Sequence, residues 1–145
     1  MDTTRYLALL AELTRWRQAP PIPSAVSNKE LARYAAKAER TAARRLTRAL
    51  AGSGNDELLH RARKAAKRAR YAAEVTSDKR TQKRFEQVQG VLGDHQDTVV
   101  ARAQLRRMAV TAGTTDGENG FAFGLLYARE QQLADDGVRA AGRLR

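Results

Sequence analysis

Apolar residues recur at the 3.6-residue period of a helix in five segments of this chain, and no segment alternates with the two-residue period of a strand over a useful length. The sequence therefore predicts an all-α fold. We expect its helices at residues 3–18, 27–51, 55–75, 79–111 and 118–142. Because short connections usually make consecutive helices antiparallel neighbours, we predict an antiparallel helical bundle of four long helices plus an N-terminal helix.

Polar residues with the properties of N-caps precede three of these helices. Ser27 and Glu30 form an S-x-x-E capping box at the start of the second helix. Asn55 is a favourable N-cap for the third helix. Thr115 and Glu118 offer a second capping box, which places the start of the last helix near residue 118.

Proline and glycine mark the ends of the first two helices. The segment Pro20–Pro23 removes backbone donors and disfavours helix at the preceding residue, so we expect a linker or hinge at residues 19–26. The sequence Gly52-Ser53-Gly54 should end the second helix. The length of 145 residues suits one domain, and we interpret residues 1–145 as a single helical domain.

The composition excludes several classes of protein. The chain has no cysteine, which excludes disulfides, a thiolate metal site and a cysteine nucleophile. No uncharged apolar run approaches the roughly 18–20 residues that cross a bilayer. The opening segment Met1–Pro20 contains several charged residues, which is not typical of a signal peptide. We therefore expect a cytoplasmic protein.

Positive charge is concentrated in the middle of the chain. The whole sequence has 27 Lys and Arg against 16 Asp and Glu, a net charge of +11. The segment Lys29–Arg84 holds 17 basic and 6 acidic residues, so it contains the entire surplus. A surplus of positive charge that served only solubility could be spread over the whole chain. Its confinement to this segment therefore predicts a polyanionic partner.

Basic residues in this segment line up on the faces of two consecutive helices, opposite stripes of small apolar residues. At 100° per residue, the basic face of the third helix centres on His60, with Arg61 and Arg68 at its edges. Its members are His60, Arg63, Lys64, Lys67, Arg70 and the aromatic Tyr71. The second helix carries a row made of Arg33, Lys37, Arg40, Arg44 and Arg48. Like charges at spacings of three and four destabilise a helix, and a bound anion would remove that cost.

The length of these rows favours an extended ligand. From Arg33 to Arg48 the row spans about 22 Å at 1.5 Å per residue, far more than one phosphate group needs. Arginine suits such a ligand because its planar guanidinium can hold two phosphate oxygens while it stays charged.

Two motifs give the chain a family resemblance. The segment His60–Glu74 reads H-R-A-R-K-A-A-K-R-A-R-Y-A-A-E, and Val88–Asp97 reads V-Q-G-V-L-G-D-H-Q-D. The first resembles the signature helix of the CHAD family (conserved histidine α-helical domain), and the second resembles that family's L-G-x-x-x-D segment. Residues Gly120–Leu126 are also similar to the start of its C-terminal helix.

The resemblance implies a helical domain that binds inorganic polyphosphate through basic surfaces. The sequence has no P-loop, no cluster of carboxylates for a metal and no nucleophile in a catalytic context, so we expect neither catalysis nor a cofactor. The contacts that the resemblance implies are His60, Arg63, Lys64, Lys67 and Arg70, and the row Arg33–Arg48 joins them on the charge argument. Members of the family contain two related helical halves, and this chain resembles the C-terminal half. It is then either part of a longer chain that supplies the N-terminal half, or a protein that forms a homodimer.

Other readings of these residues stay open. Nucleic acid is the alternative partner, bound through its backbone phosphates. His60 is either a phosphate donor that prefers to be protonated or a histidine satisfied by a neighbouring side chain. Tyr71 and Asp97 are expected to support the site, Tyr71 by packing and Asp97 by orienting arginines of a neighbouring helix. Asp94, His95 and Asp97 have no second cluster to complete a coordination sphere, so no metal site is expected.

Overall fold

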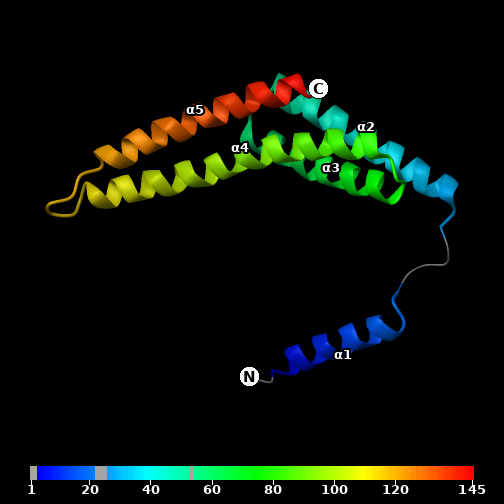
Figure 1. Ribbon diagram of the computed structural model, residues 1–145. Coiled ribbons are helices and arrows are strands. Elements are labelled where there is room, and N and C mark those ends of the chain that lie inside the picture. The colour runs from blue at the N-terminus through cyan, green and yellow to red at the C-terminus, as the bar shows by residue number, and fades with distance from the viewer. Residues whose placement is uncertain (1–2, 22–25, 53) are drawn as a thin grey trace.

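The computed structural model describes residues 3–21, 26–52 and 54–145, and within these ranges the chain is helical without any strand (Figure 1). The helices are α1 (Thr4–Gln18), α2 (Asn28–Ala51), α3 (Asp56–Val75), α4 (Lys79–Ala112) and α5 (Phe121–Arg143). The predicted all-α bundle of four long helices preceded by a shorter one is confirmed.

The predicted caps of α2 and α3 are present. The backbone N–H of Ser27 donates to Glu30 Oε2 at 3.1 Å, and the N–H of Glu30 donates to Ser27 Oγ at 3.3 Å, which completes the capping box. Asn55 Oδ1 accepts from the Leu58 N–H at 3.1 Å. Of the predicted boundaries, residue 53 and residues 22–25 of the expected linker at 19–26 lie outside the described residues.

The predicted start of the last helix at Glu118 is wrong, and so is the capping box proposed for Thr115. The Thr115 hydroxyl donates to the carbonyl of Thr111 at 2.9 Å, so it closes the end of α4 instead of opening α5. Helix α5 begins at Phe121, whose N–H donates to Asn119 Oδ1 at 3.1 Å. The loop, residues 113–120, is therefore two residues longer than the predicted loop of residues 112–117.

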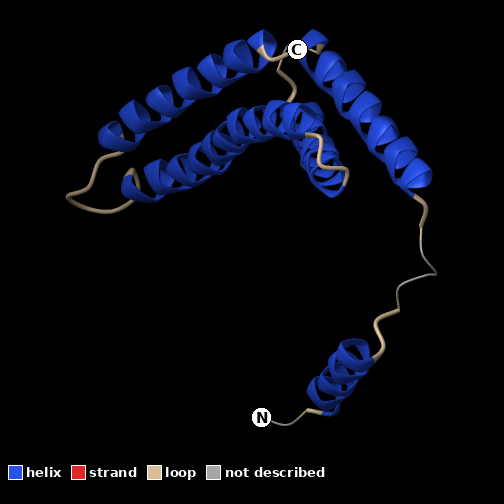
Figure 2. Cartoon of the chain, turned by 45° about the vertical axis from the view of Figure 1, so that its right-hand side comes forward, coloured by secondary structure: helices blue, strands red, loops and turns tan. Residues whose placement is uncertain are grey.

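Each of the helices α2 to α5 packs against its neighbours in the chain, and α2 touches α5 only slightly (Figure 2). Alanines line the contact surfaces of α2 and α3, which lets these helices approach closely. Five large side chains are fully buried: Leu46, Leu59, Phe85, Val88 and Leu92. The core thus lies where α2, α3 and the first half of α4 meet.

Two parts of the molecule lie outside this core. The second half of α4, a helix about 50 Å long, extends beyond α3 and pairs with α5 alone (Figure 1). Helix α1 has no buried residue and stands apart from the other helices (Figure 1). None of the described helices contains a stretch that is both long enough and apolar enough to cross a membrane.

Candidate functional site

A basic groove runs between α2 and α3 as two adjoining cavities. The first, of about 290 Å³, is lined by Leu58 and by Arg44, Arg45, Arg48 and Arg61. The second, of about 280 Å³, is lined by residues of both helices, among them Lys37, Arg45 and Arg68. Arg45 borders both cavities, so we treat them as one basic groove with six cationic side chains: Lys37, Arg44, Arg45, Arg48, Arg61 and Arg68.

Helical geometry explains why these side chains meet. Arg45 adjoins the fully buried Leu46 and lies three residues after the buried Ala42, so it stands at the edge of the surface that packs on α3. Arg61 and Arg68 are seven residues apart, which puts them on one side of α3, two turns from each other. The edges of the two packed helices therefore present their cations to the same groove.

No carboxylate lines either cavity of the basic groove. Among its six cations, Arg61 is paired with an acid, Glu57 of its own helix, and both side chains of that pair are mostly exposed. An exposed pair of this kind contributes little free energy, so another anion can readily take the place of the Glu57 carboxylate. The groove is thus a positively charged surface whose charge is largely uncompensated within the described part of the chain.

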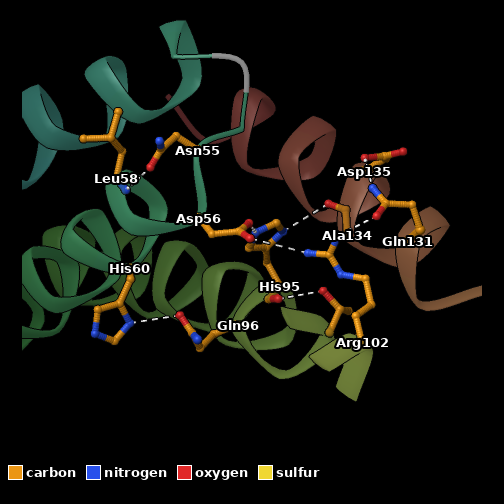
Figure 3. Close-up of polar contacts among 11 residues, drawn as sticks. Asn55, Asp56, Leu58, His60, His95, Gln96, Arg102, Gln131, Ala134 and Asp135 are labelled. Atoms are coloured by element: carbon orange, nitrogen blue, oxygen red, sulfur yellow. Dashed lines mark hydrogen bonds and ion pairs between the residues drawn. The ribbon is translucent and has the colours of Figure 1, made fainter. Parts of the chain in front are cut away.

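The other edge of α3 packs against α4 and carries three of the predicted residues. His60 Nδ1 lies 3.0 Å from Gln96 Oε1 of α4 (Figure 3). Arg63 lies against Gly93, where a Cβ atom would come within 3.4 Å of the Arg63 Nε. The guanidinium of Arg70 is 3.9 Å from Glu86 and 4.7 Å from the ring centre of Tyr71.

The structure therefore divides the predicted site residues into four groups. Lys37, Arg44 and Arg48 line the basic groove, whereas His60, Arg63 and Arg70 face α4. Lys64 and Lys67 are exposed on the arc of α3 between these two edges. Arg33 and Arg40 are exposed and line neither cavity of the groove.

Sequence reasoning missed Arg45 as a site residue and left Arg61 and Arg68 at the edge of the predicted face. All three border the apolar stripes of their helices, where a wheel drawn for one helix places them between core and solvent. Their position at the border of an apolar stripe could have identified them. Where two helices pack on each other, the side chains at the borders of the packed surfaces line the groove between the helices.

A second polar cluster joins α3, α4 and α5 around the buried His95 (Figure 3). His95 Nε2 lies 3.0 Å from Asp56 Oδ1, and His95 Nδ1 lies 3.2 Å from the carbonyl oxygen of Ala134. Both partners only accept, so both hydrogen bonds form together only when each ring nitrogen carries a proton. Arg102 lies 3.6 Å from the other oxygen of Asp56 and donates to Gln131 of α5. A cavity of about 390 Å³ adjoins this cluster.

Asp97 does not take part in an ion pair with any described residue, so the structure does not show the supporting role expected of it. It is exposed on the side of α4 that also carries Asp94. Among the described residues, the carboxylates that lie within ion-pair distance of an arginine of another helix are Glu39, Asp56 and Glu86, which the sequence pattern did not single out. Within the described residues, no group of three or more histidine and acidic side chains is arranged to hold a metal ion.

Comparison with known proteins gives a family and two relatives. The family model named CHAD domain matches residues 1–106 of the chain. Two uncharacterized proteins from two strains of Mycobacterium tuberculosis are each 39% identical to the chain over 126 residues. That alignment covers 86% of this chain and 23% of each relative, so the chain spans about a quarter of their length. No solved structure matches the chain significantly.

Proposed function

Since the chain belongs to the CHAD domain family, we propose that it is a non-enzymatic module that binds inorganic polyphosphate in the basic groove between α2 and α3. The observation that supports this proposal is the pair of adjoining cavities that share Arg45 and are lined by six cations without a carboxylate. Charged side chains bind phosphate oxygens through short hydrogen bonds, roughly twice as strong as neutral ones, and arginine can make two at once.

The groove suits a chain of phosphates better than a single anion. Lys37 and Arg48 lie eleven positions apart on α2, which is about 16 Å along the helix. A ligand that contacts cations at both ends must therefore be extended and must carry charge along its length. Each phosphate that binds also releases condensed counterions, so the affinity should rise with chain length and fall steeply as salt is added.

Exposed lysines offer a continuation of the site across α3. Lys64 and Lys67 occupy the arc between the basic groove and the edge that carries His60, Arg63 and Arg70. A long polyphosphate that leaves the groove would meet these cations next. His60 has one ring nitrogen bonded to Gln96, so in this proposal it donates to phosphate through its other nitrogen when it is protonated.

The test compares two double variants that remove the same charge. Arg45→Gln with Arg68→Gln alters the groove, whereas Arg33→Gln with Arg40→Gln removes two exposed arginines of α2 that do not line it. Charge-assisted contacts contribute about 1.5–3 kcal/mol each, so the groove variant, which loses two of them, should bind long-chain polyphosphate at least about 100-fold more weakly in titration calorimetry. The control should lose only about threefold, because Arg33 and Arg40 do not line the groove, and water and salt weaken the attraction of an exposed charge that does not contact the ligand.

Equal losses in the two variants would contradict a localised groove, provided that circular dichroism shows both variants folded. Ligand competition tests the chemistry of the site. Duplex DNA or RNA that displaces long-chain polyphosphate at equal phosphate concentration would replace this proposal with nucleic-acid binding through the backbone. Pyrophosphate that binds as tightly, per mole, as a long chain would contradict an extended site. If the purified protein shortened polyphosphate in the presence of Mg²⁺, the non-enzymatic assignment would be overturned.

A further inference from the structure

A second groove lies between α4 and α5, on the side of α4 that faces away from α3. Its volume of about 590 Å³ exceeds that of either cavity of the basic groove. Apolar side chains form much of its lining, among them Val91, Ala101, Leu133 and Ala140, and Leu133 is 45% exposed. Four carboxylates also line it, and no basic residue does: Asp94, Asp97, Glu130 and Asp136. We call this the acidic groove.

The acidic groove faces away from α3. Leu92 is fully buried in the core that α3 shares with α4, and Asp94 follows it by about 200° around the helix axis. Asp97 and Ala101 lie three and seven positions beyond Asp94, so they share its side of α4. Of the four carboxylates, Asp136 is paired with Arg139 of its own helix, and the other three are in no ion pair with a described residue.

Helix α1 has the complementary character. It spans 15 residues, none of them buried, and its large apolar side chains are about half exposed, among them Leu7, Leu10, Leu13 and Trp16. It carries three arginines and one glutamate, and the glutamate is paired with Arg15. A helix of this length is marginally stable in water unless its apolar face packs against something. Helix α1 therefore needs an apolar surface, and its net charge of +2 favours an acidic one.

The dimensions of the two surfaces agree. The apolar side chains of α1 extend from Tyr6 to Trp16, which is about 15 Å along the helix. The lining of the acidic groove extends from Val91 to Ala101 on α4 and from Glu130 to Ala140 on α5, again about 15 Å on each. We propose that the acidic groove is an interface in which α1 of a second copy of this chain docks, with its leucines on the groove floor and its arginines against the carboxylates.

The basic faces of α2 and α3 fit this groove less well than α1 does. They carry charge, but their exposed large apolar residues are the two tyrosines Tyr34 and Tyr71 and, at the last position of α3, Val75. These helices therefore have few apolar side chains to pack on Leu133 and Val91. The arrangement also favours exchange between copies. Helix α2, to which α1 is joined, packs on α3, whereas the groove faces away from α3. Reciprocal exchange of α1 across a twofold axis fills both grooves and forms a closed dimer.

Engineered cysteines test the proposal directly, because the chain has none of its own. One protein carries Leu10→Cys at the middle of α1, and the other carries Leu133→Cys on the groove floor. On mixing under mild oxidation, the two should form a disulfide-linked heterodimer well above the level that either protein forms alone. The matched control is Leu125→Cys, a leucine of α5 that is 59% exposed and does not line the groove. It should cross-link about tenfold less.

Sedimentation equilibrium of the unmodified chain gives the second measurement. We expect a mass of twice 16.0 kDa at high concentration. Leu133→Asp should shift the protein to monomer, and Leu125→Asp should not, with the helical signal unchanged in both. A chain that stays monomeric and does not cross-link overturns the proposal. So does a disulfide formed only within single chains of a Leu10→Cys, Leu133→Cys double variant, because α1 would then dock on its own molecule.

Discussion

Replacement of Asp56 by alanine should destabilise the fold much more than the same change at the next residue, Glu57. Both acids lie in the first turn of α3, where a negative charge interacts favourably with the helix dipole by about 0.3–1 kcal/mol. They differ in what they contact. Asp56 bonds His95 of α4 and lies near Arg102, whereas Glu57 pairs with Arg61 one turn along its own helix.

The contacts give the expected magnitudes. Loss of Asp56 leaves the Nε2 donor of His95, a side chain only 4% exposed, without its partner, which costs about 1–3 kcal/mol. The contact with Arg102 adds at most about 1 kcal/mol, because the Asp56 carboxylate is 48% exposed and solvent screens it. With the dipole contribution, Asp56→Ala should cost about 2–4 kcal/mol. Glu57→Ala loses the dipole contribution and an exposed pair, about 1 kcal/mol in total.

Urea unfolding followed by circular dichroism measures both values. A two-state domain of this size is typically stable by about 5–15 kcal/mol, so the Asp56→Ala midpoint should fall clearly below that of Glu57→Ala. Asp56→Asn keeps an oxygen that accepts from His95 and should recover part of the loss. Equal destabilisation by Asp56→Ala and Glu57→Ala would refute the reasoning, because only the shared position in the first turn would then matter.

Three further predictions concern the core, a helix cap and the proposed ligand site. Phe85→Ala should cost about 3–5 kcal/mol of unfolding free energy in the same assay, because Phe85 is fully buried, whereas Phe121→Ala, at a side chain 73% exposed, should cost under about 1 kcal/mol. Hydrogen bonds from the hydroxyl and backbone N–H of Ser27 hold the pKa of Glu30 below its ordinary value of 4.5. The ionised carboxylate therefore stabilises α2 at a pH above 4.5, and this stabilisation is lost as the pH falls through the lowered pKa. The melting temperatures of Glu30→Gln and of the unmodified chain should therefore differ at neutral pH and converge in acid. If His60 donates to phosphate in its protonated form, polyphosphate should bind more tightly at about pH 6 than at about pH 8, and His60→Ala should flatten this dependence in a calorimetric titration.

The helices and two of their caps could be predicted from the sequence because they depend on local information. The Ser27–Glu30 box and the Asn55 cap need only residues three apart, and both are present in the structure. The start of α5 could not be predicted in the same way. The Thr115 hydroxyl could either cap the start of α5 or bond the end of α4. It donates to the carbonyl of Thr111 in α4, and the first N–H of α5 donates to Asn119 instead.

The candidate site depends on packing between helices, which a single-helix pattern does not contain. The helical wheel identifies side chains that point away from the core, such as Arg33 and Arg40. A groove, however, is lined by side chains at the border of the packed surface, such as Arg45 and Arg68. The surroundings of His60 and Arg63, on the edge of α3 that faces α4, could not be predicted for the same reason. The packing of α4 on α3 places Gln96 beside His60 and Gly93 beside Arg63.

The two grooves carry opposite charge on different helices, which resolves a difficulty for a chain with a net charge of +11. Copies with that charge repel one another, and the basic surplus lies on the segment that contains α2 and α3. The acidic groove of α4 and α5 provides the surface on which a copy can be held despite this repulsion. Because α1 docks there in the proposed dimer, the basic groove of each copy stays open. If the proposed ligand and the proposed dimer both hold, a long polyphosphate that reaches both basic grooves would be bound twice, and its second contact would be intramolecular. The dimer should then hold long polyphosphate more tightly than short polyphosphate, even where each groove binds the same number of phosphates.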